Sequence, residues 1–316
     1  IFWATPTFSL PILESIIKAN HEILAIVTQP DKRRGRGNKI LGSPIKEKAK
    51  ELGIKIFNPD SVRKDLEFQN DISKLPADLY VVVAYGQILP VEVLNIPPLG
   101  CWNIHASLLP KWRGAAPIQW SLLSGDKTTG VTIMAMEKGL DTGPILLQEE
   151  IKIDLNDNAK SLSSKLSNLS SKLINISLNK IGDVGIGNET ERYKKLNLMS
   201  QESIPRSVQY ARPFTKEDML INWEDSAIHI HRKIMGLYPY AYTYWKGKRL
   251  KILNSIPYDE YYLQYLSEFD VTNVTDQNEK HIPGEISNVL NGIGLIVAAK
   301  DSQLFINKVK LEGKSE

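Results

Sequence analysis

Two polar side chains with catalytic potential, Asn103 and His105, lie two positions apart in the run GCWNIHA (100–106). Side chains at i and i+2 of an extended strand project to the same side, so the amide and the imidazole would face the same space. An amide can stabilise a developing oxyanion and an imidazole can transfer a proton, which makes them a candidate catalytic pair. An Asn and a His near a strand end are more often hydrogen-bonded structural residues, and spacing alone does not exclude that role.

A third candidate is Asp141, in the run GLDTG (139–143). The flanking glycines, Gly139 and Gly143, predict a tight loop between two strands. The ordinary interpretation of an isolated Asp-Thr-Gly is an Asx-type turn. Aspartic proteases carry the same tripeptide, but they need a second carboxylate, and no second Asp-Thr-Gly or Asp-Ser-Gly occurs in the chain. Nothing local links Asp141 to Asn103 and His105.

The first half of the chain alternates short apolar runs with amphipathic stretches, a pattern typical of βαβ units. Thr5 and Pro6 suggest the cap and first residue of a helix. We predict a Rossmann-like α/β domain with a mostly parallel sheet, and open sheets of this kind bind ligands at the carboxyl ends of their strands. The expected strands are 1–4, 22–29, 54–59, 79–86, 100–106, 129–137 and 144–153, and the expected helices include 44–52, 114–125 and 158–181.

The pattern of apolar and polar residues changes after the glycines of 182–187. A helix is predicted at Ser226–Met235, followed by short β-rich runs around the turn 246–248. These runs indicate a small, mostly antiparallel domain, of a kind that can close into a barrel. We therefore expect a catalytic domain at 1–182, a linker at 183–205 and a second domain at 206–316.

Composition sets outer limits on function. The 316 residues are 42% hydrophobic and 24% charged, as in ordinary soluble proteins. No apolar run approaches the roughly 20 residues that span a bilayer, and the N-terminal run lacks the features of a secretory signal, so we expect a cytoplasmic protein. The single cysteine, Cys101, excludes an internal disulfide. His229 and His231 would lie roughly 200° apart on their helix, so we predict no metal site.

A basic run lies between Gln29 and Lys39, where five basic residues face a single acid, Asp31. By itself such a run is usually a solvated surface loop. The net charge of +3 is too small to prove a nucleic-acid partner. The location of the charge, rather than its total, makes the run a candidate nucleic-acid contact.

Taken together, these segments resemble the formyltransferase family that uses 10-formyltetrahydrofolate. The resemblance is carried by N-x-H at 103–105, SLLPKWRG at 107–114, AAPI at 115–118, GDKTTGVTIM at 125–134 and GLDTG at 139–143. It implies that Asn103, His105 and Asp141 are catalytic, with the reduced folate as co-substrate and no metal. It further implies a folate site bordered by Ser107, Leu108, Leu109 and Pro110, and by the backbone around Tyr85 and Gly86.

Within that family, TQPDKRRGRGNK (28–39) and RGAAPIQW (113–120) resemble the members that formylate methionine on initiator tRNA. The resemblance implies that Arg34, Arg36 and Lys39 contact the acceptor stem of initiator methionyl-tRNA. It also implies a C-terminal barrel similar to an OB fold, in which basic residues at 246–249 could meet phosphates. We expect a monomer, and we expect the barrel of the family to continue beyond the run LEGK (311–314).

Two alternatives stay open. Related enzymes give the formyl group to an amino sugar, a purine precursor or water, but the basic run and the C-terminal domain argue against them. A tRNA-binding protein without activity could also use the same scaffold, but Asn103, His105 and Asp141 argue against it.

Overall fold

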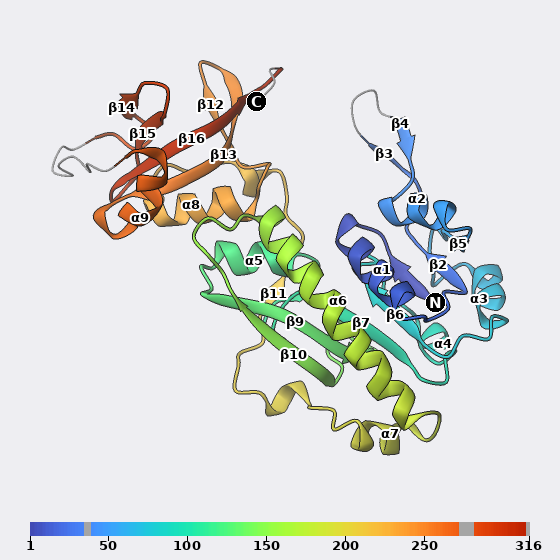
Figure 1. Ribbon diagram of the computed structural model, residues 1–316. Coiled ribbons are helices and arrows are strands. Elements are labelled where there is room, and N and C mark those ends of the chain that lie inside the picture. Colours follow the sequence, from blue (N-terminus) through green and yellow to red (C-terminus); the bar gives the residue numbers. More distant parts are fainter. Residues whose placement is uncertain (35–38, 272–280, 314–316) are drawn as a thin grey trace. The chain divides into compact units, whose positions relative to one another are not determined.

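The computed structural model describes residues 1–34, 39–271 and 281–313. The chain forms two compact units, which we describe separately (Figure 1). The first consists of Ile1–Pro117, Thr129–Ile151 and Ser163–Arg212, and the second of Ile118–Thr128, Lys152–Leu162 and Pro213–Glu316. The second unit thus takes three separate segments of the chain, and the expected linker at 183–205 lies within the first unit.

The first unit is built on a seven-stranded sheet with the order β10-β9-β7-β6-β1-β2-β5. Its strands are β1 (Phe2–Ala4), β2 (Ala25–Val27), β5 (Lys55–Phe57), β6 (Tyr80–Val83), β7 (Cys101–His105), β9 (Thr128–Ala135) and β10 (Ile145–Lys152). Strands β1, β2, β5, β6 and β7 pair in parallel, whereas β9 is antiparallel to β7. The prediction of a Rossmann-like, mostly parallel sheet is confirmed.

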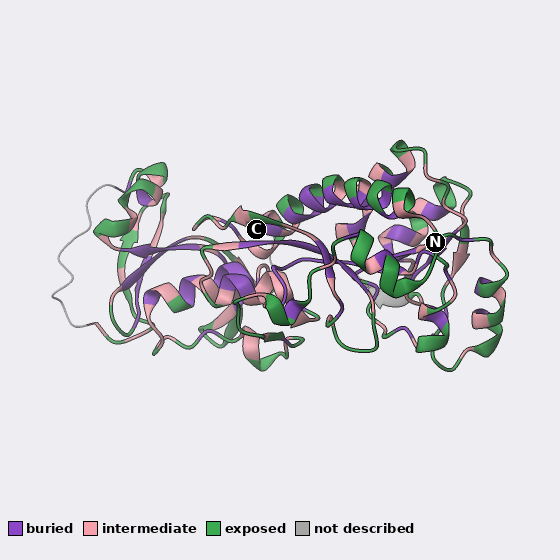
Figure 2. Cartoon of the chain, turned by 90° about the horizontal axis from the view of Figure 1, so that it is seen from below, coloured by how far each residue is buried: buried purple, intermediate pink, exposed green. Residues whose placement is uncertain are grey.

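Burial follows the order of the strands. Every residue of β1, β6 and β7 is buried, whereas the edge strands β5 and β10 expose part of their length. Figure 2 shows buried residues along strands and on one side of the helices, with exposed residues on the opposite side of the helices and in loops. A strand that is buried along its whole length must be covered on both faces, as in the centre of a parallel sheet. Burial on both faces explains the continuously apolar runs in the sequence.

Helices and short elements complete the first unit. The helices are α1 (Leu10–Lys18), α2 (Pro44–Glu51), α3 (Leu66–Ser73), α4 (Val91–Leu94), α6 (Ala159–Val184) and α7 (Glu189–Lys195), with the 3-10 turns η1 (Thr7–Ser9) and η2 (Gln201–Ser203). Two small ladders pair β3 (Lys32–Arg34) with β4 (Lys39–Leu41), and β8 (Arg113–Gly114) with β11 (Tyr210–Ala211).

The two faces of the sheet have different partners. On one face, Trp3 and Val82 pack with Phe68 of α3 and Val93 of α4. Side chains alternate along a strand, so the neighbouring residues serve the other face. There, Phe2 of β1 lines a cavity together with residues of α1 and α6. The long helix α6 and α1 are also joined by hydrogen bonds, including one from the Ser15 hydroxyl to the backbone of α6.

The prediction that Thr5 caps a helix beginning at Pro6 is wrong. The chain first forms η1, and α1 begins only after Ser9. The Thr5 hydroxyl instead donates to the carbonyl of Tyr85 at 3.0 Å and accepts the backbone N–H of Gln29 at 3.4 Å. The side chain therefore joins the segments that follow β1, β6 and β2, at the carboxyl end of the sheet.

The second unit contains a five-stranded sheet with the order β12-β13-β16-β15-β14. Its strands are β12 (Tyr242–Trp245), β13 (Lys248–Tyr258), β14 (Ile286–Leu290), β15 (Gly294–Ala298) and β16 (Gln303–Leu311), and all neighbours are antiparallel. The prediction of an antiparallel second domain is confirmed, including the turn between β12 and β13. In the described residues no pairing joins β12 to β14, so a closed barrel stays a prediction.

Helices pack on this second sheet. They are α5 (Pro117–Leu123), α8 (Ala227–Gly236) and α9 (Leu263–Leu266), with the 3-10 turns η3 (Glu217–Met219), η4 (Glu260–Tyr262) and η5 (Ser267–Phe269). The helix predicted at 226–235 is confirmed, and the Ser226 side chain caps it by accepting the N–H of His229. Ile230 and Ile234 of α8 share a buried apolar cluster with Ile252 of β13.

Candidate functional site

Strand β7 positions the first two candidate residues. Asn103 and His105 lie two apart on this strand, opposite Met134 and Thr132 of β9. The two residues are 9% and 5% exposed. A buried amide and a buried imidazole need hydrogen-bond partners, because an unpaired polar group away from water costs free energy. The partners identify the site.

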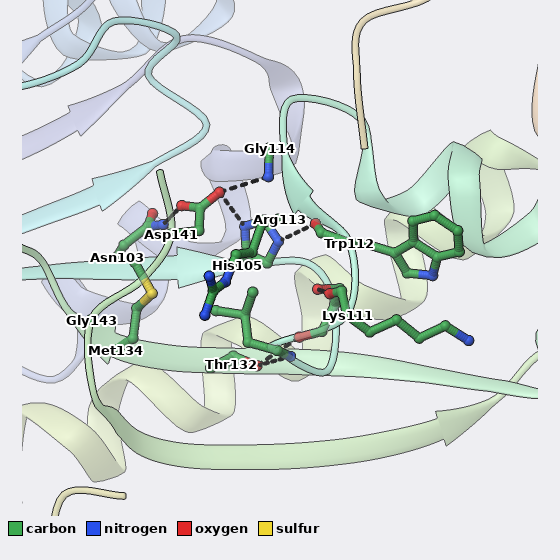
Figure 3. A network of polar contacts seen from close by, with 12 residues as sticks. Asn103, His105, Lys111, Trp112, Arg113, Gly114, Thr132, Met134, Asp141 and Gly143 are labelled. Carbon is green, nitrogen blue, oxygen red and sulfur yellow. Dashed lines mark hydrogen bonds and ion pairs between the residues drawn. The ribbon is translucent and has the colours of Figure 1, made fainter. Parts of the chain in front are cut away.

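Both residues contact the carboxylate of Asp141 (Figure 3). Asn103 donates from Nδ2 to Oδ1 at 3.1 Å, and Nδ1 of His105 lies 3.6 Å from Oδ2. The backbone N–H of Gly114 donates to Oδ2 at 2.8 Å. Asp141 is 38 residues from Asn103 in the chain, yet the structure brings all three predicted residues together.

The loop that carries Asp141 has little freedom. Asp141 has φ +54°, in the left-handed region that non-glycine residues seldom adopt. At Gly143 an added Cβ would overlap the carbonyl oxygen of Ala135, so the loop can pass β9 this closely only with glycine. The Gly-x-Asp-x-Gly spacing that suggested a tight turn thus reflects backbone packing.

The contacts of His105 fix the position of one proton. Nε2 lies 2.9 Å from the backbone carbonyl of Trp112. A carbonyl oxygen only accepts, so Nε2 carries a hydrogen, and in the neutral ring Nδ1 is then the unprotonated nitrogen. That nitrogen faces Asp141. A proton that arrives at Nδ1 creates an imidazolium held between a carboxylate and a carbonyl.

The segment after β7 forms a tight turn that includes a cis peptide bond between Leu109 and Pro110. Ser107 is fully buried, and its hydroxyl donates to the carbonyl of Lys111 at 2.6 Å. Thr132 donates to the Ser107 carbonyl and accepts the N–H of Leu109. The four residues predicted to border the folate, 107–110, are all buried and lie beside His105 in this turn.

The second predicted folate segment follows β6. Ala84 and Gly86 both have positive φ, so the chain turns sharply at the carboxyl end of the strand. The Tyr85 side chain points into the core, where its ring lies 5.2 Å from that of Trp3. Burial raises the pKa of the Tyr85 hydroxyl. The Tyr85 side chain is therefore directed away from any ligand at this edge, and the folate contact of the backbone around Tyr85 and Gly86 stays a prediction.

The described part of the basic run includes β3 (Lys32–Arg34) and the first residue of β4 (Lys39–Leu41), and these strands pair in register from Lys32 with Leu41 to Arg34 with Lys39. Arg34 and Lys39 are thus the last described residues on either side of 35–38. Arg36 lies outside the described residues, as does the rest of 35–38.

Several residues that hold the site were not predicted from the sequence. The structure adds Trp112, Gly114, Thr132 and Gln201, each bonded to a predicted residue or its loop. Gly114 has φ +117°, and a Cβ there would lie 2.9 Å from the Ala211 carbonyl oxygen. A glycine directly after the SLLPKWR run was a usable signal, whereas Gln201 lies in a segment without any motif.

Other reactive groups are outside this arrangement. Cys101 is buried and donates to the Leu94 carbonyl at 3.5 Å, and burial raises the pKa of its thiol. Within the described ranges, no group of three or more His, Cys, Asp or Glu side chains is arranged to hold a metal. None of the helices in the described part of the chain has the length and apolar character needed to span a membrane.

Comparison with known proteins agrees with this geometry. Residues 1–177 match the family model described as formyl transferase, and residues 213–316 match its C-terminal domain. Proteins named methionyl-tRNA formyltransferase are similar over the whole chain. One from Prochlorococcus marinus is 52% identical over 100% of this chain and 93% of the relative. One from Synechococcus sp. (strain WH7803) is 47% identical over 100% of this chain and 92% of the relative.

Solved structures share the fold at lower identity. An N-formyltransferase from Helicobacter canadensis, in complex with folinic acid and dTDP-3-aminofucose, superposes with a TM-score of 0.64 at 18% identity, covering 98% of each chain. The sugar 3N-formyl transferase WlaRD gives a TM-score of 0.63 at 18% identity, covering 99% of this chain and 97% of the other.

Fold, site and family matches define an enzyme of the formyl transferase class. The chain belongs to the formyl transferase family and, within it, to the methionyl-tRNA formyltransferases, since relatives of that name are 44–52% identical over nearly their full length.

Proposed function

We propose that this chain transfers the formyl group of 10-formyltetrahydrofolate to the α-amino group of methionine on initiator methionyl-tRNA. The observation that carries the proposal is the cluster of Asn103, His105 and Asp141 at the carboxyl end of β7. An amide donor and an imidazole that both contact one carboxylate are the groups that acyl transfer to an amine requires.

The first step is attack of the neutral amine on the formyl carbon, which forms a C–N bond and places negative charge on the formyl oxygen. Asn103 has two N–H groups and directs one to Asp141, so the amide can offer the other to this oxyanion. His105, once protonated, adds positive charge beside the same centre. Donors fixed before the reaction stabilise such charge by roughly 3–4 kcal/mol each.

The proton balance then passes through His105 and Asp141. The attacking nitrogen loses a proton, which Nδ1 of His105 or the carboxylate facing it accepts. The tetrahedral intermediate then collapses, the C–N bond to the folate breaks, and the departing folate nitrogen takes up a proton from the same pair. The transfer thus ends with the two residues in their starting state and needs no covalent intermediate.

The donor and acceptor are inferred from relatives. The Helicobacter canadensis enzyme is described in complex with folinic acid, which supports a reduced folate as the formyl donor. The curated relatives carry methionyl-tRNA in their names, which supports a charged tRNA as the acceptor. Arg34, Arg36 and Lys39 of the basic run at 29–39 are the proposed contacts to its acceptor stem. The three proposed catalytic residues all come from one unit of one chain, so we propose that the enzyme acts as a monomer. We also propose that it works in the cytoplasm, because its proposed acceptor is a charged tRNA.

An acceptor assay tests the proposal. The enzyme and 10-formyltetrahydrofolate are incubated separately with initiator methionyl-tRNA, methionyl elongator tRNA, a dTDP-amino sugar or buffer alone. Formylated methionine should appear on the initiator tRNA much faster than on any other acceptor.

The remaining outcomes decide against the proposal in different ways. Faster formylation of the amino sugar would reassign the acceptor while retaining the catalytic residues. Release of formate without an acceptor would indicate a hydrolase. Binding of tRNA without formyl transfer would indicate a binding protein on the enzyme scaffold.

A further inference from the structure

A buried glutamine, Gln201, contacts the backbone of the loop that carries Asp141. The residue is 4% exposed, and its Nε2 donates to the carbonyls of Asp141 and Gly143, both at 2.8 Å. Its Oε1 accepts Nε and Nη2 of Arg113 at 3.0 and 2.7 Å. Gln201 lies in the stretch between the two family-model matches, which end at 177 and resume at 213.

The orientation of this amide is determined by its partners. The guanidinium of Arg113 has only donors, so it must face the oxygen of Gln201. The two loop carbonyls only accept, so they must face the nitrogen. Both N–H groups are used, and the oxygen receives two donors. An amide that is satisfied in this way holds its partners in a fixed geometry.

The contacts of Gln201 complement those of the catalytic carboxylate. The side chain of Asp141 is held by Asn103 and Gly114, whereas its backbone carbonyl is held by Gln201. Asp141 needs this support because its φ of +54° is unfavourable for a residue with a side chain. The carboxylate can face His105 only while the backbone keeps that conformation.

Gln201 also connects the two segments that meet at Asp141. Arg113 directly precedes Gly114, whose N–H donates to the carboxylate at 2.8 Å. Two residues before Gln201, the backbone of Met199 exchanges hydrogen bonds of 2.8 and 2.9 Å with Ile145 at the start of β10. The backbone just before Gln201 is thus fixed to β10, and the Gln201 side chain joins the 113–114 segment to the 141–143 loop.

We propose that Gln201 is a positioning residue for formyl transfer, which acts by holding the Asp141 loop so that the carboxylate faces His105 and Asn103. The inference rests on the proposed role of Asp141. It assigns a function in catalysis to the stretch between the two family-model matches.

The substitution Gln201→Glu separates this role from simple packing. Glutamate has the same shape and strengthens the contact with Arg113, but it places a carboxylate oxygen against two carbonyl oxygens. If Gln201 only fills space and pairs with Arg113, the enzyme tolerates this change. If Gln201 must donate to the loop, the enzyme does not tolerate it, because the two hydrogen bonds to the loop carbonyls are replaced by repulsion between oxygens. Gln201→Met, which keeps the volume without charge, serves as a second variant.

We expect Gln201→Glu to lower kcat by roughly 10²-fold, because small displacements of catalytic groups have effects of that size. The KM for each substrate should stay within about threefold, since no substrate contact is removed. The control is Glu202→Gln, an exposed neighbour on the same turn, which should keep wild-type kcat and KM. The rates of all variants are measured with the acceptor that the wild-type enzyme prefers. If that acceptor is not initiator methionyl-tRNA, the proposed function changes, but the test of Gln201 remains valid.

Coupling to Asp141 is the decisive measurement. In an Asp141→Asn background, Gln201→Glu should add less than about threefold to the loss, because a residue acting through the carboxylate has nothing left to position. Full additivity of the two losses would overturn the proposal, as would wild-type kcat in Gln201→Glu. Circular dichroism and thermal unfolding establish folding, and failure of both the Glu and Met variants to fold would reassign Gln201 to the fold itself.

Discussion

Nδ1 of His105 lies 3.6 Å from Oδ2 of Asp141, while Nε2 of the same ring donates to the Trp112 carbonyl. The nitrogen that faces the carboxylate is therefore the unprotonated one in the neutral ring, and it is the atom that we propose gains and loses a proton. The distance is longer than a hydrogen bond, and catalytic contacts commonly shorten when substrates bind. The relationship supports the proposed proton-accepting pair, whose members come from the end of β7 and from the β9–β10 loop.

Replacing Asp141 with Asn tests this pair. An amide cannot accept a proton or balance an imidazolium, so kcat should fall by roughly 10²-fold or more. The fold should remain, because the side-chain volume is unchanged. Steady-state kinetics with the preferred acceptor measure the effect, and Asp183→Asn on α6 is the exposed control. Near-wild-type turnover in Asp141→Asn would falsify the catalytic assignment.

The close approach at Gly143 predicts a loss of both stability and activity in Gly143→Ala. The new methyl overlaps the Ala135 carbonyl oxygen, so the loop must shift. We expect a cost of about 1–3 kcal/mol in the free energy of unfolding, as for overpacked positions, together with a reduced kcat.

A glycine elsewhere in the same unit gives the opposite expectation. Gly182 lies in α6 with nothing within 4 Å of an added Cβ. Gly182→Ala should therefore stabilise the protein by about 0.5–1 kcal/mol through helix propensity, with no effect on kcat. Chemical denaturation compares the two variants, and equal behaviour would show that the Gly143 loop is not constrained by β9.

The sequence predicted those features that depend on local patterns. The run at 79–86 indicated a central strand because it is continuously apolar, and β6 is buried along its whole length. Asn103 and His105 were expected on one side of a strand because of the two-residue period, and both contact Asp141. The strands β3 and β4 were not predicted, since charged residues there gave no alternating pattern.

Features that depend on long-range packing left no local signal. Asp141 meets Asn103 because β7 and β9 pair in one register and the following loop turns back, which no spacing rule specifies. The contact between Gln201 and that loop spans 60 residues. Similarly, 118–128 and 152–162 lie in the second unit, although the strands beside them belong to the first. The family resemblance supplied the link to Asp141, and only the three-dimensional structure revealed Gln201.

The basic run at 29–39 predicts a salt-dependent effect on tRNA use. Arg36→Ala should lower kcat/KM for the charged tRNA and reduce the slope of log(kcat/KM) against log salt by about 0.7–0.9, as for the loss of one phosphate contact. Initial rates are measured across a series of KCl concentrations. Arg63→Ala, which removes an exposed arginine elsewhere, should leave the slope unchanged. Identical slopes for Arg36→Ala and wild type would remove Arg36 from the proposed interface.

The second unit contains a buried histidine that makes stability depend on pH. His231 lies between two carbonyls, with Nδ1 2.8 Å from that of Ser255 and Nε2 3.1 Å from that of Leu155. Burial lowers its pKa from the ordinary 6.5 to about 4, although both carbonyl contacts favour the charged ring. The Ser255 hydroxyl, 3.4 Å from Nδ1, can donate to the neutral form. The folded state therefore keeps His231 neutral.

This lowered pKa predicts that the free energy of unfolding decreases as the pH falls. Above pH 6.5 the ring is neutral in both states, and the full stability is present. As the pH falls below 6.5 the unfolded chain gains a proton that the folded chain does not, so stability decreases until about pH 4. A tenfold change in proton affinity corresponds to about 1.4 kcal/mol, so the loss amounts to about 3 kcal/mol.

In His231→Gln this pH-dependent loss of stability disappears, while His229→Gln, exposed on the same helix, retains it. Urea denaturation of the three proteins at several pH values between about 4 and 7 measures the difference, and parallel curves for His231→Gln and wild type would contradict the neutral buried histidine.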